Sequence, residues 1–426
     1  MLNLPEKLKL NRILIQNFTS LSILQIANYL FPLIVLPYVV RILGPAKYGL
    51  INFAAAFIAY FSLMCDYGFS LSGTKEISII RDDKEKLSRT FSTIITIKLL
   101  LSVVSFLLFI LIVYFIPFFK NNWEVYVLSY GFVIGGVLFP GWFYQGIERM
   151  KYITIIQVFV RSIATVLIFM LVNEENDYLL LVLLNSSAQI LIGVAGLIVA
   201  GIKFKIKFRL PSFEEIKSQL KSGWNIFQSM IAINVYTTSN TFILGLFASE
   251  TIVGYYAAAD KIRMAFQGVQ SVLAQTVFPH VNSLAKESYE KFILFIKRFL
   301  KLEVTIGFSV SLLLFIFSPQ LVELLLGEKF VTSGELLRII SALPLLISLS
   351  NIFGIQIMLP LGYDRAFNRI ISSAALLHIL LLIVIVPAYF AIGTSIAVVI
   401  TESVVTLLTF LFVMRKKILI TSKNFN

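Results

Sequence analysis

Three charged side chains interrupt a stretch, Val253–Gln275, whose length and apolar content suit a membrane-spanning helix. They are Asp260, Lys261 and Arg263. At 3.6 residues per turn, one face of this helix holds Asp260, Arg263, Gln267, Gln270 and Ser271. Lys261 lies about 100° around the helix from Asp260. Because a charge inside a bilayer costs at least ~2.5–3.5 kcal/mol, these side chains must face protein, water or a charged ligand.

Two interpretations fit this charged face. Asp260 and Arg263 are three residues apart, so they could neutralise each other and lock the helix into a bundle. In the second interpretation, the polar and net cationic face lines a transport cavity and binds an anion. The surplus positive charge, with Lys261 added to Arg263, favours the second interpretation.

Other polar residues fall within predicted spans. Arg161, near the middle of the fifth span, is expected either to line the cavity or to pair with a carboxylate. Arg338, one turn inside the tenth span, is expected either to line the cavity or to anchor the helix at the membrane interface. Lys98 is expected to snorkel to the cytoplasmic surface. The candidate carriers of a coupling ion, each with the alternative of a satisfied buried polar group, are Asp260, Glu402, Asp66 and His378. Asparagines that could join helices or line the cavity are Asn28, Asn225, Asn234 and Asn240.

The composition identifies the class of protein. Of the 426 residues, 58% are hydrophobic and 14% charged, which is typical of an all-α, polytopic membrane protein. The one cysteine, Cys65, cannot form an intramolecular disulfide, and the two histidines are too far apart for a metal site. We find no phosphate-binding loop and no large external loop for an enzyme, so we expect no cofactor, no metal and no catalytic residues.

The apolar runs predict twelve spans at residues 13–37, 49–71, 91–116, 125–146, 153–172, 179–201, 222–246, 254–279, 297–318, 335–359, 370–388 and 393–414. With both termini in the cytoplasm, 27 of the 36 Lys and Arg residues fall in cytoplasmic segments and 4 in external loops. This bias follows the positive-inside rule and explains the formal charge of +13 without a nucleic-acid partner.

Short internal matches indicate a duplication of six spans. Gly49 and Gly254 each open the second helix of a half, in GLINFAAAF and GYYAAADKI. QGIERM at Gln145–Met150 and LGYDRA at Leu361–Ala366 each close a fourth helix, and aligning them pairs Gly146 with Gly362. Because six spans return the chain to the same side, the two repeats are expected to be parallel.

We therefore expect an N-terminal lobe at 1–201, a cytoplasmic linker at 202–221 and a C-terminal lobe at 222–426. The linker begins with the basic run KFKIKFR, which suits anchorage on anionic lipid better than nucleic-acid binding. After it, SFEEIKSQLKS predicts a short amphipathic interfacial helix with Ser212 as its N-cap.

Three segments resemble one transporter family: RILGPAKYG at Arg41–Gly49, PGWFYQGIERMKY at Pro140–Tyr152 and VGYYAAADKI at Val253–Ile262. They are similar to the Wzx-type polysaccharide flippases, which share a superfamily with the multidrug and toxin extruders (MATE) and the lipid II flippases. The resemblance implies a V-shaped, two-lobed bundle around a cavity that opens alternately to each side. It also implies the passenger, an undecaprenyl-pyrophosphate-linked oligosaccharide carried across the bacterial cytoplasmic membrane. Lipid II flippases typically have fourteen spans, so the twelve counted here argue against that branch.

A pyrophosphate cannot cross hydrocarbon unshielded, and arginine binds phosphate oxygens with a planar fork that stays charged when partly buried. The residues expected to bind the passenger are Arg263, Lys261, Arg161, Gln267, Gln270 and Arg338. Without an ATP site, transport must be driven by an ion gradient, the membrane potential or consumption of the product outside. Expected protein partners are a polymerase and a chain-length regulator. The alternatives are a drug or cation exporter, which should have an anionic or apolar cavity, and a polysaccharide polymerase.

Overall fold

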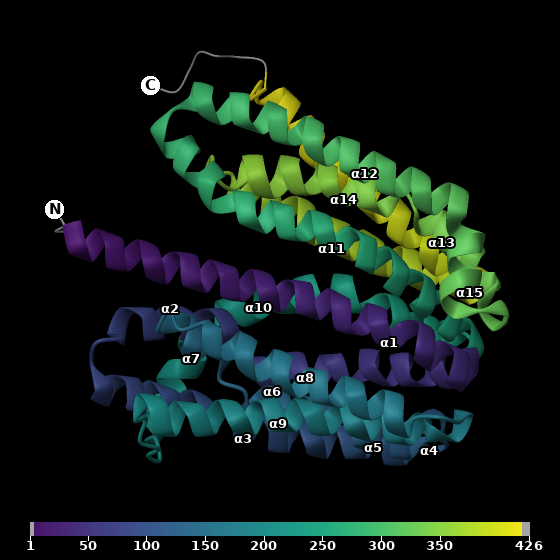
Figure 1. Ribbon diagram of the computed structural model, residues 1–426, viewed down its shortest axis with the longest axis horizontal. Helices are drawn as coiled ribbons and strands as arrows, with labels where there is room; N and C mark the ends of the chain where they lie inside the picture. The colour runs from purple at the N-terminus through teal and green to yellow at the C-terminus, as the bar shows by residue number, and fades with distance from the viewer. Residues whose placement is uncertain (1–3, 420–426) are drawn as a thin grey trace. The chain divides into compact units, whose positions relative to one another are not determined.

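The computed structural model describes residues 4–419, with side chains described for 16–419 except 18, 225, 229, 232–237 and 269. The described residues form helices joined by short connections (Figure 1). In chain order the helices are α1 (Leu4–Asp66), α2 (Phe69–Ile80), α3 (Lys84–Phe115), α4 (Pro117–Lys120), α5 (Trp123–Ser129), α6 (Gly131–Leu138), α7 (Gly141–Gly146), α8 (Lys151–Leu171), η1 (Glu175–Asp177), α9 (Tyr178–Phe204), α10 (Phe213–Phe247), α11 (Glu250–Glu287), α12 (Tyr289–Leu326), η2 (Glu328–Phe330), α13 (Thr332–Ile340), α14 (Leu343–Asn351), η3 (Ile352–Met358) and α15 (Asp364–Arg415).

The predicted all-α, multi-pass architecture is confirmed. Eight helical segments among the described residues are long and apolar enough to cross a membrane. Two of these segments each contain two spans, because α1 is broken at Gly44, where φ is 68°, and α15 at Phe390, where φ is 46°. The more polar helices α10 and α11 are outside the eight, so the spans predicted at 222–246 and 254–279 stay predictions.

The helices group into two compact units, each of which has its own core. Unit 1 comprises Met1–Val35 and Leu50–Asn234, and unit 2 comprises Leu36–Gly49 and Val235–Asn426. The predicted lobes divide the chain between the sixth and seventh spans, at residues 201 and 222. The two compact units instead divide it inside α10, between Asn234 and Val235.

Aromatic packing dominates the core of unit 1. Phe91 on α3 meets Phe143 on α7 edge to face, with ring centroids 5.2 Å apart, and Trp142 lies 5.5 Å from Phe91. All three rings are buried, and such edge-to-face pairs add roughly 0.5–1.5 kcal/mol beyond the area they bury. This cluster fixes the short α7 against α2 and α3.

In unit 2, α12 packs against α11, α13 and α14, and Figure 1 shows these helices lying side by side. Phe292 and Ile296 on α12 and Ile357 on η3 are fully buried in the core of this unit. The same packing brings the polar face of α11 against α12 and α14.

The linker is held to α3 through Glu215. The predicted N-cap is confirmed, since Ser212 Oγ accepts from the Glu215 backbone N–H at 3.3 Å and Glu215 Oε2 accepts from the Ser212 N–H at 2.6 Å. Arg89 of α3 and Arg209 of the basic run also bond to Glu215. The pKa of the Glu215 carboxyl is lowered, mainly by the hydrogen bond from the Ser212 N–H and to a smaller extent by the guanidinium groups of Arg89 and Arg209.

The separate interfacial helix predicted for the linker is wrong. The amphipathic residues are the first turns of α10, which continues without a break to Phe247. The one residue that could end it, Gly223, has no left-handed backbone and packs against the ring of Tyr67, only 3.2 Å from where its Cβ would lie.

The two matched helix ends share one backbone motif, with a register two residues from the predicted one. Glu148 and Gly362 both have left-handed backbones, with φ of 58° and 78°. Each is followed by an N–H that reaches back five residues, Arg149 to Tyr144 O at 2.8 Å and Tyr363 to Met358 O at 2.9 Å. These are equivalent helix-ending motifs, so Glu148 corresponds to Gly362 and the predicted pairing of Gly146 with Gly362 is wrong.

Candidate functional site

On the charged face of α11, Asp260 and Arg263 form an ion pair, as the first of the two interpretations expected. Arg263 Nε donates to Asp260 Oδ1 at 2.7 Å, and Arg263 Nη1 donates to Gln267 Oε1. These contacts use two of the five N–H donors of the guanidinium. Among the described residues, none accepts a hydrogen bond from the remaining three. The pair therefore orients Arg263 without exhausting its capacity to bind an anion.

Exposure falls along this face from one end to the other. The Asp260 side chain is 27% exposed and that of Arg263 11%, while as whole residues Arg263 is 9% exposed and Gln270 4%. Lys261, half-buried beside the pair, carries the surplus positive charge. An anion therefore has access to the Asp260 end of the face, whereas the Gln270 end is enclosed by other helices of unit 2.

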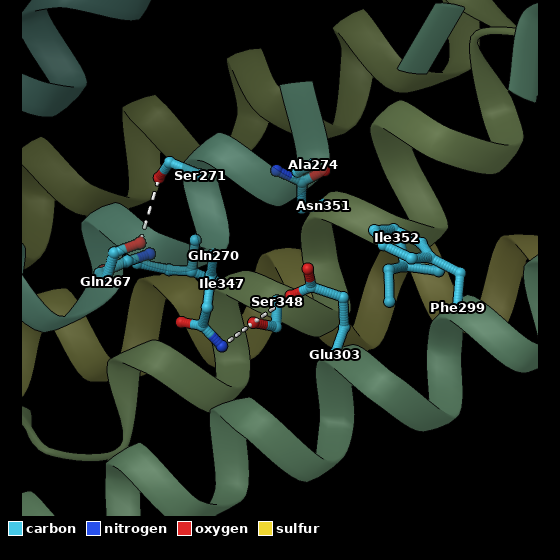
Figure 2. Close-up of a pocket in the computed structure, with 10 residues that line it drawn as sticks. All are labelled: Gln267, Gln270, Ser271, Ala274, Phe299, Glu303, Ile347, Ser348, Asn351 and Ile352. Atoms are coloured by element: carbon cyan, nitrogen blue, oxygen red, sulfur yellow. Dashed lines mark hydrogen bonds between the residues drawn. The ribbon is translucent and has the colours of Figure 1, made fainter. Parts of the chain in front are cut away.

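At the enclosed end, α11 is joined to α14 and α12 by polar contacts. Gln270 Nε2 donates to Ser348 Oγ at 2.6 Å, and Ser348 Oγ donates to Glu303 Oε2 at 3.3 Å. Figure 2 shows these three side chains beside a small cavity whose wall also includes Asn351. Ser271 bonds back to the carbonyl of Gln267 at 3.3 Å and does not reach a neighbouring helix.

Arg161 lies in unit 1, on α8, and its partner is neutral. Its Nη1 donates to Asn28 Oδ1 on α1. No carboxylate in the described part of the chain forms an ion pair with it, so its positive charge is not compensated there. Asn28 thus joins two helices, which was one of its two expected roles, and leaves Arg161 without a counter-charge.

Lys98 does not snorkel, and that prediction is wrong. Its side chain is 4% exposed, donates to Gly136 O at 3.0 Å and lies 3.8 Å from Asp66 Oδ1. Lys98 does not extend to a surface because it points into unit 1, where it contacts residues of α1 and α6. Asp66, predicted as an ion carrier, also accepts from Ser70 Oγ at 2.9 Å.

Arg338 is not brought to the charged face of α11. Its side chain is exposed on α13, where Nε donates to Phe315 O on α12 at 3.2 Å. The guanidinium also lies 5.7 Å from the centre of the Phe315 ring. These contacts favour the anchoring interpretation over cavity lining.

The two other predicted ion carriers, His378 and Glu402, are buried on α15 and hydrogen-bonded. His378 contacts Thr401 Oγ1 at 2.9 Å and Asn240 Oδ1 at 2.8 Å. Glu402 Oε1 accepts from Ser350 Oγ at 2.5 Å. Asn240 therefore joins helices, one of its two expected roles, while the side chains of Asn225 and Asn234 lie outside the described residues.

Sequence reasoning missed one acidic residue, Glu303. It lies in the predicted ninth span, and its side chain is 3% exposed. The signal was available, since a lone carboxylate in an apolar span is the feature that singled out Glu402.

Residues 14–284 match the family model described as "Polysaccharide biosynthesis protein". The "Putative O-antigen transporter" of Escherichia coli (strain K12) is 33% identical over 418 residues, which cover 97% of this chain and 99% of that protein.

Two solved structures have the same fold at low identity. The lipid II flippase MurJ, in an inward closed conformation, superposes with a TM-score of 0.70 at 14% identity, covering 96% of this chain and 90% of that chain. A multidrug resistance MATE family transporter of the MOP superfamily, inward-facing, gives a TM-score of 0.68 at 16% identity, covering 94% and 98%. The predicted MATE-like fold is thereby confirmed.

Proposed function

Because this chain belongs to the polysaccharide biosynthesis protein family, we propose that it is a flippase that moves a lipid-linked oligosaccharide across the membrane. The observation that carries the proposal is the likeness to an O-antigen transporter, which extends over nearly the whole of both chains. A multi-pass fold shared with transporters agrees with it. The protein is a transporter in this proposal, and not an enzyme.

The positive charges of both units suit a passenger with a pyrophosphate link between lipid and sugar. Arg263 keeps three N–H donors available, and Arg161 keeps an uncompensated charge. A phosphate accepts bidentate, charge-assisted hydrogen bonds from such groups. We assign Arg263 and Lys261 to the diphosphate of undecaprenyl-pyrophosphate, and Arg161 to a contact that unit 1 makes with the passenger. Gln267 holds the guanidinium in place.

Deleting the gene tests the function. The deletion strain should accumulate the lipid-linked oligosaccharide on the cytoplasmic face of the inner membrane and lose the surface polysaccharide. The loss should be restored by the wild-type chain. Normal surface polysaccharide in a strain without a redundant flippase would overturn the proposal, and ethidium efflux that depends on this chain would favour a drug exporter instead.

We also propose that both termini are cytoplasmic, which labelling of introduced cysteines tests. After Cys65 is replaced by Ala, single cysteines at Asn176 and Glu250 should react with an impermeant maleimide added to intact cells. Cysteines at Lys84 and Lys207 should react only after the membrane is opened, because the positive-inside rule keeps their basic segments inside. Reaction of the second pair in intact cells would contradict this orientation.

A further inference from the structure

The small cavity at the enclosed end of the α11 face is lined by oxygen atoms that lack donors. Glu303 Oε1, Gln270 Oε1 and Asn351 Oδ1 are buried, and none accepts a hydrogen bond from a residue the structure describes. Glu303 and Gln270 are both more than nine-tenths buried. Leaving such groups without a partner costs roughly 1–3 kcal/mol each, and more for a charged one.

The cavity has the size and chemistry of a site for one small cation. Its volume is about 20 Å³, which is enough for one water molecule or one small ion. Of the ten residues that line it, Glu303 alone carries a charge, and no ion pair to Glu303 is found in the described range. Carboxylate and amide oxygens are the ligands that hard cations prefer.

The surrounding charges do not neutralise Glu303. On α11, Asp260 and Arg263 are paired with each other, and Lys261 forms no ion pair with Glu303 among the described residues; α14 and η3 contain no charged residue. The charged residues of η2 and α13, which also pack against α12, are exposed; they are Glu328, Lys329, Glu335 and Arg338. The carboxylate must therefore be neutralised by something that enters the cavity.

The wall of the cavity has an irregular backbone. Asn351 is the last residue of α14, and the π-helical segment η3 follows it directly, with Ile352 also lining the cavity. π-helical turns are rare and occur frequently at functional sites, where they redirect side chains and carbonyl groups. We propose that Glu303, Gln270 and Asn351 bind a small monovalent cation, a sodium ion or a proton, which neutralises Glu303.

A proton would be taken from water and would form an O–H bond at Glu303 Oε1, whereas a sodium ion would be held by all three oxygens. The relay from Glu303 through Ser348 to Gln270 places this site on the same helix as Arg263, two turns away. Occupancy of the site can therefore alter the position of α11. That coupling rests on the proposed flippase function, while the binding of the cation does not.

The test measures binding on the purified full-length chain in the absence of any passenger. Radioactive sodium should bind saturably to the wild type, and Glu303→Gln should weaken it by about tenfold or more. Glu323→Gln, the same substitution at an exposed position of α12, is the control and should bind as the wild type does. Glu303→Asp keeps the charge and serves if the Gln variant does not fold; it should retain measurable binding.

If the cation is a proton, the wild type binds no sodium, and its unfolding temperature in sodium-free buffer changes across about pH 5 to 9. That change should be lost in Glu303→Gln and kept in Glu323→Gln. The proposed cation site would be overturned if neither the sodium binding nor the pH dependence of the unfolding temperature changed in Glu303→Gln. Because the deletion strain is scored separately, a normal polysaccharide there would remove the flippase proposal and leave this result standing.

Discussion

Arg263→Ala should reduce transport of the passenger at least about 100-fold, because a phosphate contact through two charge-assisted hydrogen bonds is worth roughly 1.5–3 kcal/mol per bond. The protein should still insert and accumulate. The Asp260 carboxylate that loses its partner is 27% exposed, so solvent screens much of the cost. Surface polysaccharide and protein level, measured in the same cells, separate lost transport from lost protein.

The ion pair predicts an asymmetry between the two single variants. Removing Asp260 leaves the 11% exposed guanidinium with only Gln267 as an acceptor, which is the more costly of the two orphaned charges. Asp260→Ala should therefore lower the protein level more than Arg263→Ala does. Arg263→Lys keeps the charge and loses the fork, so it should transport partly.

The double variant decides between the two interpretations of the face. In Asp260→Ala/Arg263→Ala neither member of the ion pair is left without its partner, so the protein level should recover. If Arg263 holds the passenger, transport should stay lost. Full transport by the double variant would remove the pyrophosphate role and leave Arg263 as a structural partner. Arg298→Ala, an exposed arginine on α12, is the control and should behave as the wild type.

Helical periodicity predicted the charged face correctly because it depends only on residues close in sequence. Asp260, Arg263 and Gln267 meet through bonds three and four residues long, which the 3.6-residue repeat fixes. The partner of Arg161 lies 133 residues away on another helix, and no local pattern could identify Asn28 among the polar residues of the chain.

Two of the errors have different physical origins. Lys98 was expected to reach the surface, but it is buried by contacts with Gly136 and Asp66, which are distant in sequence and belong to other helices. The repeat was aligned two residues out of register because its left-handed position is Gly362 in one half and Glu148 in the other. A non-glycine residue rarely adopts that conformation, so the sequence of the first half concealed the motif.

Gly49 and Gly254, which were expected to open the second helix of each repeat, pack against each other. Substituting either should destabilise unit 2. A Cβ on Gly49 would lie 1.8 Å from Glu250 O, and one on Gly254 would lie 2.0 Å from Pro45 O. Both obstacles are backbone atoms, which cannot rotate away as a side chain does. Gly49→Ala and Gly254→Ala should therefore each push α1 and α11 apart and cost about 1–3 kcal/mol or more, measured as a lower unfolding temperature.

The same contact predicts how the two substitutions combine. Once one alanine has separated the helices, the second meets less resistance, so the double variant should cost clearly less than the two single costs together. Gly201→Ala on α9, where nothing lies within 4 Å of the added Cβ, is the control. It should be neutral or raise the unfolding temperature, since alanine stabilises a helix by about 0.8–1.0 kcal/mol relative to glycine. Additive costs at Gly49 and Gly254 would contradict a shared contact, and the duplicated glycines would then be two separate packing sites.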